Sequence, residues 1–344
     1  MWEERADRAR RDILALAAEG HGLTEVYQQA IAVIKRSVGA ELSCWAVLDP
    51  DTLAIGGMVS GRTRIPRQYE PLLADAECSA EEPHTFAALA REGRPIARLS
   101  ELPAAERDHS ARVREVWRPL GLDREVRTLF TADGACWGAA GMVRTGRDFD
   151  ERELEFLAAV APAVATAARL AVRAEACAPA PGAEPAIVVL GERGEPLTAT
   201  AAARDWRGRF DELAPGRFEL LLHLMWAGAR ASADGVFRTL MRDGRARWAV
   251  LEASPLIGER ENEVAVLVSA AGPDDLGGLL LAAYGLTARE REICREVVLG
   301  HPTGEIGQRL AISAYTVQDH LKSVFAKVGV HSRGELVERL RPAA

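Results

Sequence analysis

The sequence predicts a multidomain chain in which two α+β modules precede an all-α module of four short helices. The length of 344 residues is enough for two or three domains that each bury a core. Strand and helix patterns alternate up to residue 270, whereas residues 284–344 carry helix signals alone. We therefore expect domains at 1–177, 186–270 and 284–344, joined by linkers at 178–185 and 271–283.

The composition is that of an ordinary globular protein. The chain is 48% hydrophobic and 27% charged, which argues against a collagen-like or wholly disordered protein. No uninterrupted apolar run reaches the roughly 18–20 residues that span a bilayer, and the charged N-terminus is unlike a secretory signal. The five scattered cysteines argue against a disulfide framework or a zinc site. We expect a cytoplasmic protein with no membrane partner and no cofactor.

The first module carries helix, sheet and helix signals in turn. The Asp-Gly pair at 133–134 predicts a hairpin turn, because Gly supplies the positive φ that such turns need. Asp150, followed by Glu153, predicts the N-cap of a long helix. The expected elements are helices at 2–19 and 23–38, strands at 42–48 and 55–60, a short helix at 85–91, strands at 126–131 and 136–143, and a helix to about residue 176.

The helix that ends near residue 176 carries two apolar stripes. Leu157 and Val164 belong to one stripe, and Phe156 and Val160 belong to the other. One stripe is enough to cover the sheet of its own module. The second stripe predicts either a partner helix from a second subunit, which would make a homodimer, or burial within one chain, and the residues leave both alternatives open.

The second module predicts a small sheet with helices inserted after its second strand. The Asp-Gly pair at 243–244 marks another hairpin turn. The expected elements are strands at 186–190 and 197–200, helices through about residue 231, and strands at 235–241, 247–253 and 263–269.

The last module predicts a helix-turn-helix arrangement. Thr287 with Glu290, and Ser332 with Glu335, form capping boxes that start helices. A short helix at 303–310 and a longer helix at 314–328 flank a tight turn. The longer helix turns apolar residues at 4-3-4 spacing toward the core and polar residues away from it. The inward residues are Val317, Leu321, Val324 and Val328.

Four segments of this module resemble the LuxR-type DNA-binding domain. They are Leu286-Thr-Ala-Arg-Glu-Arg-Glu-Ile, Glu305-Ile-Gly-Gln-Arg-Leu, Ser313-Ala-Tyr-Thr-Val-Gln-Asp-His-Leu-Lys and Lys327-Val-Gly-Val-His-Ser-Arg. The resemblance implies that the longer helix enters the major groove of double-stranded DNA. The chain departs from the family at Gly307, where Ala is usual, and at Gln318-Asp319, where many members carry a basic residue first.

The outer face of the longer helix offers the side chains that would read DNA. Gln318 fits adenine N6 and N7, and Lys322 fits guanine O6 and N7 or a phosphate. Asp319 is repelled by phosphates unless it accepts from cytosine N4 or pairs with Lys322. Ser313 and Thr316 start the helix and can place hydroxyl and backbone N–H groups on a phosphate. The predicted DNA-contacting residues are Ser313, Tyr315, Thr316, Gln318, Asp319, Lys322, Lys327 and Arg333, the last two on the backbone alone.

The charge is unevenly distributed along the chain. The net charge is −7, but residues 284–344 carry nine Arg or Lys against seven acids, so the last module is +2 and the preceding residues are −9. Phosphate contacts need local positive charge. A surplus this small predicts DNA binding that is weak for a monomer, sensitive to salt and dependent on dimerisation.

Two further resemblances concern the preceding modules. Leu48-Asp-Pro-Asp-Thr-Leu and Cys136-Trp-Gly-Ala-Ala-Gly-Met are similar to segments of GAF domains joined to LuxR-type tails, and the second module resembles a degenerate PAS domain. They imply a sensory region and a small-molecule ligand. Trp45, Trp117 and Trp137 are the candidates to line an apolar ligand pocket, although buried aromatic residues are usually core.

Two other functions stay open. Cys44 and Cys136 lie on adjacent predicted strands and would form a redox pair if their Cα atoms lay within ~7 Å. A regulatory adaptor that acts through protein contacts, with RNA polymerase as its partner, is the second alternative. Asp49 with Asp51 and Glu81 with Glu82 are interpreted as turn and solvated charges, and no Gly-rich phosphate loop lies beside them, so we do not expect an enzyme. The sequence thus predicts a homodimeric, sequence-specific transcriptional regulator with a GAF-like sensor, a PAS-like module and a LuxR-type helix-turn-helix domain.

Overall fold

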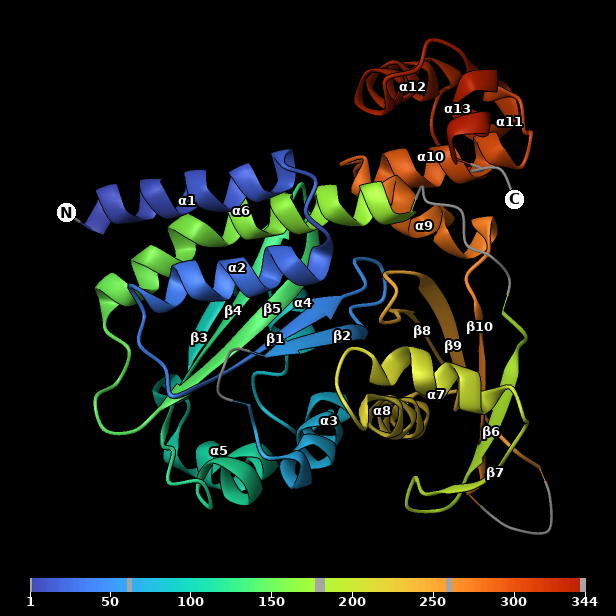
Figure 1. The fold of residues 1–344 in the computed structure, drawn as a ribbon. Coiled ribbons are helices and arrows are strands. Elements are labelled where there is room, and N and C mark those ends of the chain that lie inside the picture. The colour runs from blue at the N-terminus through green and yellow to red at the C-terminus, as the bar shows by residue number, and fades with distance from the viewer. Residues whose placement is uncertain (1, 61–63, 177–182, 258–261, 341–344) are drawn as a thin grey trace.

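The computed structural model describes residues 2–60, 64–176, 183–257 and 262–340. Two five-stranded antiparallel sheets and a helical C-terminal domain build the described chain (Figure 1). The strand orders are β2-β1-β5-β4-β3 and β7-β6-β10-β9-β8, which are the same order counted within each module. The predicted succession of two α+β modules and an all-α module is confirmed. Residues 178–182 of the first predicted linker lie outside the described residues.

The first module has helices on both faces of its sheet. α1, α2 and α6 cover one face, and α3, α4, α5 and three short η segments cover the other (Figure 1). The elements are α1 (Trp2–Ala18), α2 (Leu23–Lys35), β1 (Leu42–Leu48), β2 (Ile55–Ser60), η1 (Arg67–Tyr69), α3 (Glu70–Cys78), α4 (Phe86–Arg91), β3 (Ile96–Arg98), η2 (Leu99–Glu101), α5 (Ala104–His109), η3 (Arg112–Trp117), β4 (Arg124–Ala132), β5 (Ala135–Arg144) and α6 (Glu151–Ala176).

Local signals in the sequence account for several of these boundaries. The turn between β4 and β5 places Asp133 and Gly134 at φ values of 52° and 73°, as the Asp-Gly pair predicts. At the start of α6, the Glu153 N–H donates to Asp150 Oδ1 at 3.0 Å and the Asp150 N–H donates to Glu153 Oε2 at 2.9 Å. This reciprocal capping box satisfies two donors that the first turn would otherwise leave free.

Both apolar stripes of α6 are buried within the chain. One side of the helix packs on β4, and the other packs on α1 and α2, so Phe156, Leu157, Val160 and Val164 are at most 3% exposed. The second stripe therefore gives no surface for a second subunit, and burial within one chain is the alternative that holds. Among the described residues, α6 is also the one helix long and apolar enough to cross a membrane. Its packing in the first core makes it the central helix of a folded module.

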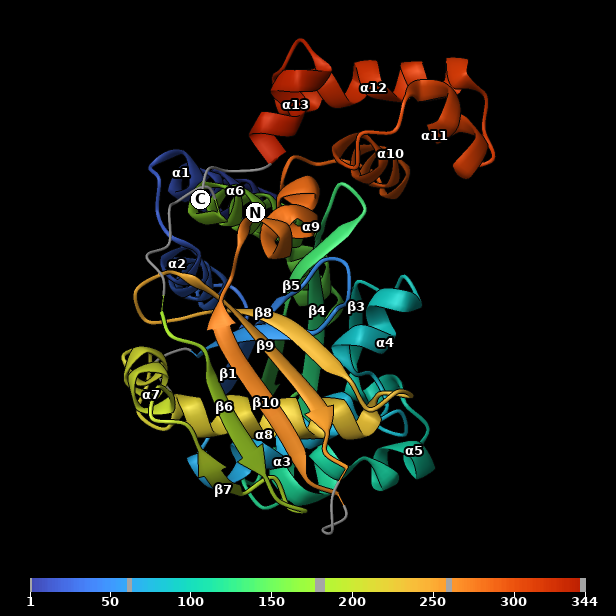
Figure 2. The same ribbon diagram turned by 90° about the vertical axis from the view of Figure 1, so that its right-hand side faces the viewer.

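The second module covers one face of its sheet with two helices, α7 and α8 (Figure 2). Its edge strand β8 lies against β2, the edge strand of the first sheet, and Gly56 makes this approach possible. A Cβ at Gly56 would lie 2.4 Å from the carbonyl oxygen of Leu240. The elements are β6 (Ala186–Leu190), β7 (Pro196–Ala199), α7 (Ala203–Asp211), α8 (Arg217–Ala231), β8 (Phe237–Arg242), β9 (Trp248–Pro255) and β10 (Val264–Ala270).

The stretch predicted as the second linker forms a helix, α9 (Pro273–Ala283), which packs on α6. Pro273 occupies the first helical position, and Asp275 Oδ2 accepts from the Gly272 N–H at 2.7 Å. Leu276 and Leu280 bury their side chains in the core of the first module. The Gly-Pro-Asp-Asp sequence that suggested a linker is thus the start signal of this helix.

The C-terminal domain consists of four helices around a small core of its own, as predicted. They are α10 (Ala288–Val298), α11 (Thr303–Arg309), α12 (Ala314–Val328) and α13 (Arg333–Leu340). The four inward residues of the longest helix, α12, are buried as the 4-3-4 spacing requires. α12 lies on the side of the domain that faces away from both sheets (Figures 1 and 2).

Candidate nucleic-acid interface

A tight turn sets the angle between α11 and α12. The Ile312 N–H donates to the Gly307 carbonyl at 2.9 Å, and Ala311 adopts a positive φ of 55°. A Cβ at Gly307 would lie 2.8 Å from the carbonyl oxygen of Ile312. Gly307 therefore permits the close approach of α11 to the start of α12.

The N-terminus of α12 carries hydroxyl groups and free backbone donors. Ser313 is the N-cap, and its Oγ accepts from the Thr316 N–H at 3.0 Å. The two hydroxyl oxygens lie 2.8 Å apart. The first N–H groups of a helix have no partner within it, and the helix dipole favours an anion there. Ser313 and Thr316 are thus brought together where a phosphate oxygen would be held.

The outer face of α12 is exposed in the described chain. Tyr315 is 71% exposed, and Gln318, Asp319 and Lys322 are also exposed. Lys322 Nζ donates to Asp319 Oδ1 at 3.0 Å, so the acid on this face is paired with the lysine one turn away. The structure brings these side chains together on one surface as the helical spacing predicts.

Lys327 serves the domain's own structure. Its Nζ donates to Glu290 Oε2 at 2.7 Å, and Ser323 Oγ donates to Glu290 Oε1 at 2.6 Å. Glu290 is 4% exposed and also accepts from the Thr287 N–H at 2.7 Å. Burial opposes its ionisation, but the hydrogen bonds from Lys327, Ser323 and Thr287 outweigh burial and lower the Glu290 pKa to about 2. The predicted phosphate contact of Lys327 therefore competes with an ion pair that joins α12 to α10.

Arg333 is likewise engaged within the domain. Its Nη2 donates to the His301 carbonyl between α10 and α11. Arg289 donates to the Leu310 carbonyl and pairs with Glu292, and Arg309 lies 2.7 Å from Glu296. Lys327, Arg333, Arg289 and Arg309 thus bind acids or carbonyl groups of the domain itself. Lys322 and the first turn of α12 remain as the exposed groups best placed for DNA.

Two further arginines of α10 face the first module. Asp51, in the turn between β1 and β2, lies 3.3 Å from Arg291 and 3.2 Å from Arg295. The chain passes from α9 to α10 beside Arg169 of α6, whose Nη1 donates to the Ala283 carbonyl at 3.2 Å. The C-terminal domain is therefore docked on the first module. This contact could not be predicted from the sequence.

The tight turn and the exposed outer face of α12 define a helix-turn-helix domain. Residues 285–340 match the profile of bacterial regulatory proteins of the luxR family (GerE), so this C-terminal domain is a helix-turn-helix domain of that family. The profile covers the last domain and leaves the two preceding modules unmatched.

Two curated relatives share this domain. The HTH-type transcriptional activator RamA of Corynebacterium glutamicum is 41% identical over 56 residues, which are 16% of this chain and 20% of that protein. The monoamine regulon transcriptional regulator of Klebsiella aerogenes is 48% identical over 60 residues, or 17% of this chain and 26% of that protein. The chain thus spans about a fifth to a quarter of the relatives it matches.

A solved Vibrio cholera VqmA–ligand–DNA complex is 18% identical with a TM-score of 0.21, and the match covers 46% of this chain and 80% of that one.

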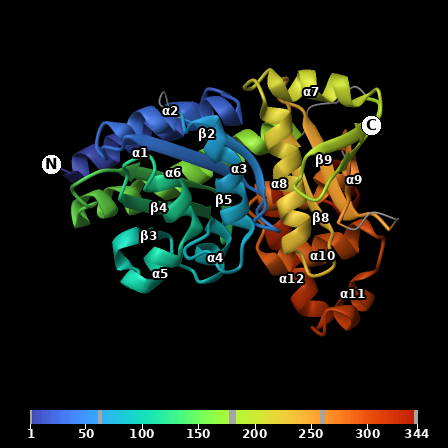
Figure 3. The same ribbon diagram turned by 90° about the horizontal axis from the view of Figure 1, so that it is seen from below.

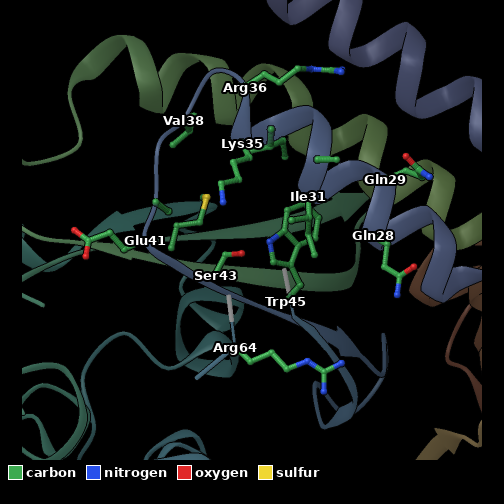
Figure 4. A pocket seen from close by; sticks show the side chains of 14 residues that line it. Gln28, Gln29, Ile31, Lys35, Arg36, Val38, Glu41, Ser43, Trp45 and Arg64 are labelled. Carbon is green, nitrogen blue, oxygen red and sulfur yellow. The ribbon is translucent and has the colours of Figure 1, made fainter. Parts of the chain in front are cut away.

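The three candidate tryptophans do not line a common pocket. Trp45 and Trp137 belong to the core beneath α2 and α6, where the Trp45 ring lies 4.7 Å from the Phe130 ring, centroid to centroid. Trp117 lies on the opposite face of the sheet. Trp45 also borders an open groove of about 760 Å³ beside Lys35 and Ser43 (Figure 4). Trp117 belongs to η3, which packs on the opposite face of the sheet from α2 and α6, and the sequence alone did not reveal this separation.

The proposed redox pair is contradicted by the strand register. Cys44 of β1 lies opposite Gly141 of β5, five residues from Cys136. At ~3.3 Å per residue this separation is roughly 16 Å, far beyond the reach of a disulfide. Burial raises the pKa of Cys44, Cys78 and Cys294 to about 12 and also raises that of Cys136, so these thiols are protonated at neutral pH. Cys177 lies outside the described residues.

Metal ligation has no candidate in the described parts of the chain. No group of three or more His, Cys, Asp or Glu side chains there is arranged to hold a metal ion.

Proposed function

We propose that the chain is a sequence-specific DNA-binding transcriptional regulator that reads the major groove with α12. The observation that carries the proposal is the exposed polar face of α12, which belongs to a helix-turn-helix domain of the luxR family. The inner face of the helix is anchored by four buried apolar residues and by the Glu290–Lys327 ion pair, so the outer face is held rigidly for recognition.

Each exposed group has a part in this proposal. Gln318 donates to and accepts from an adenine edge, and Lys322 contacts guanine or a phosphate. The N-terminus of α12 at Ser313 and Thr316 binds a phosphate and fixes the register of the helix in the groove. Tyr315 contributes a further contact beside Gln318. Lys327 and Arg333 act chiefly by holding the helices in place.

We further propose that the two α+β modules are a GAF-like and a PAS-like sensory region and that the protein works as a homodimer in the cytoplasm. A single recognition helix on which Lys327 is engaged by Glu290 gives few phosphate contacts, and a dimer doubles them. Its two half-sites would lie about one helical turn, ~34 Å, apart. Sedimentation of the purified chain measures the oligomeric state directly.

Selection of bound sequences from a random DNA pool tests the central proposal. The full chain is expected to enrich one motif, and Gln318→Ala is expected to lose the preference at one base pair of that motif. Gln29→Ala, on an exposed position of α2 far from α12, is the matched control and should enrich the unaltered motif. If the full chain enriches no sequence, the chain acts as an adaptor through protein contacts and the proposal fails.

A further inference from the structure

A cleft of about 340 Å³ opens between the first and second modules. One wall is formed by β2 and by residues 64–67, and includes Val59 and Ile65. The other wall is formed by the start of α8 and the loop before it, including Leu213 and Leu220. The volume lies within the range of small-molecule sites, which bury a ligand between apolar walls and a few polar groups.

Arg217, the first residue of α8, is buried at this cleft. It is 9% exposed and lines both the cleft and an enclosed cavity of about 50 Å³ beneath the first sheet. Its guanidinium reaches across the module boundary, since a Cβ at Gly57 of β2 would lie 3.9 Å from its Nη2. α8 itself lies beside α3 of the first module (Figure 3). A ligand held by Arg217 would therefore contact both modules.

The guanidinium of Arg217 lacks the carboxylate that the neighbouring buried arginines have. Its Nε has no hydrogen-bond partner in the described parts of the chain. The other two buried arginines of the described chain each have an acid as partner: Arg112 lies 2.8 Å from Glu82 and 3.1 Å from Glu125, and Arg127 pairs with Glu77. Burial of an unpaired charge costs free energy unless an opposite charge or a hydrogen-bond partner is supplied.

Glu70 is the carboxylate whose charge acts on Arg217, after the Cys44 thiol. Burial raises the Glu70 pKa, and the neighbouring Arg217, Arg67 and Arg64 offset this only in part. Burial also lowers the pKa of Arg217 in spite of Glu70. The charges of Arg64, Arg67 and Arg217 thus all act on one half-buried carboxylate. The cleft keeps an excess of positive charge.

We propose that this cleft binds a small organic anion, whose carboxylate or phosphate pairs with Arg217 and whose apolar part lies against Leu213, Leu220 and Val59. A planar guanidinium offers two parallel donors to either group. The inference rests on the proposed function in one respect only: it identifies this anion as the signal to which the regulator responds. The binding itself is independent of DNA. An anion seated there fixes the second module against the first, on which the C-terminal domain is docked.

Calorimetric titration of the full chain, without DNA, tests the site with matched probes. Octanoate and octanamide differ in charge and hardly in shape, and octyl phosphate distinguishes a phosphate from a carboxylate ligand. The wild-type chain is expected to bind at least one of the two anions about tenfold more tightly than octanamide. Arg217→Met should bring all three probes within about twofold of one another, while Arg217→Lys should keep part of the preference.

Arg204→Met is the matched control, because Arg204 is an exposed arginine of α7 outside the cleft. It should keep the full preference for the anion. Thermal unfolding of the ligand-free variants supplies a second readout. Arg217→Met should unfold at the same or a higher temperature than the wild type, because it removes an uncompensated charge.

Three results would overturn the proposal: no binding of either anion at millimolar concentration, equal binding of anions and octanamide by the wild type, or an undiminished preference in Arg217→Met. A lower unfolding temperature for ligand-free Arg217→Met would also count against it, since Arg217 would then hold the modules together by itself. A failure of DNA binding leaves all these measurements unchanged, so the two proposals are tested separately.

Discussion

Asp319 and Lys322 lie on one exposed turn of α12, where Lys322 Nζ is 3.0 Å from Asp319 Oδ1. This ion pair competes with DNA for the charge of the lysine. An exposed pair of this kind contributes less than about 1 kcal/mol, so a phosphate or a guanine can displace the carboxylate. Asp319 is thus a modulator of Lys322, and it can also accept from cytosine N4.

Asp319→Ala is expected to change base preference at one position of the bound sequence and to leave non-specific affinity equal or higher. The reason is that the variant removes a negative charge beside phosphates and frees Lys322. Selection from a random pool measures the preference, and fluorescence anisotropy with unrelated DNA measures the non-specific affinity. Uniformly weaker binding to every sequence would show that Asp319 has a different role.

Glu290 predicts a pH-dependent stability. Its folded pKa of about 2 lies below the ordinary 4.5, so its contribution is fully present above pH 4.5 and is lost as the pH falls toward 2. A shift of this size corresponds to about 3 kcal/mol. Glu290→Gln should therefore lower the free energy of unfolding at pH 7 by an amount of this order.

The difference between the Glu290→Gln variant and the wild type should shrink as both proteins are brought from pH 4.5 to pH 2. Chemical denaturation followed by circular dichroism measures it across this range. Glu292→Gln, at an exposed position on the same helix, is the control and should change the free energy of unfolding by less than about 0.5 kcal/mol. A constant difference at every pH would mean that the ionised form of Glu290 is not what stabilises the domain.

At the scale of an element, α11 offers a matched pair of glycines. A Cβ at Gly304 meets open space, whereas a Cβ at Gly307 meets the Ile312 carbonyl. Gly304→Ala should stabilise the domain by up to about 1 kcal/mol through helix propensity. Gly307→Ala should forfeit that gain and cost about 1 kcal/mol, because the turn into α12 must shift.

Thermal unfolding and DNA affinity measure both glycine variants. Gly307→Ala is expected to lower both quantities, since the displaced turn also moves Ser313 at the start of the recognition helix. Gly304→Ala is expected to leave DNA affinity unchanged. Equal stabilisation by the two variants would show that the turn accommodates a methyl group without strain.

Elements with local start and stop signals could be predicted from the sequence. The bounds of β1, β2 and β6 and the capping boxes of α6 and α10 follow from alternation, turn residues and cap residues close by in the chain. α9 was mistaken for a linker because its Gly-Pro-Asp-Asp start resembles a break. The burial of its leucines depends on α6, more than a hundred residues earlier.

The outer face of α12 could be predicted for the same reason, since helical spacing alone places Gln318, Asp319 and Lys322 together. The engagement of Lys327 could not, because its partner Glu290 lies on another helix. Arg217 gave no signal at all. Arg217 is a candidate ligand-binding residue because no carboxylate pairs with it in the described chain, and only the packing of one module on the other shows this.

At the scale of the whole molecule, Asp51 ties the C-terminal domain to the first module. Asp51→Asn removes the charge that faces Arg291 and Arg295, so the domain should detach more often about Gly285, which has a positive φ of 71°. Exposed ion pairs are weak, and the detached population should rise by no more than about fivefold. Small-angle X-ray scattering should show a larger radius of gyration.

High salt should expand the wild type in the same way, because it screens the same ion pairs. Asp7→Asn, which breaks an exposed pair within α1, is the control and should leave the scattering unchanged. If neither Asp51→Asn nor salt changes the radius of gyration, apolar contacts hold the domain and the Asp51 pairs are incidental.

α9 packs on α6 although the whole second module lies between these two helices in the sequence. The polypeptide leaves α6, builds the whole second module, and returns to α6 before it enters the DNA-reading domain. In architectural terms the second module is an insertion into a helical pair. A protein in which a short connection replaces that insertion would keep its first module joined to its DNA-binding domain. The α6–α9 pair is therefore the unit to retain when this domain is fused to another protein, and the inserted module can be gained or lost without a change in that pair.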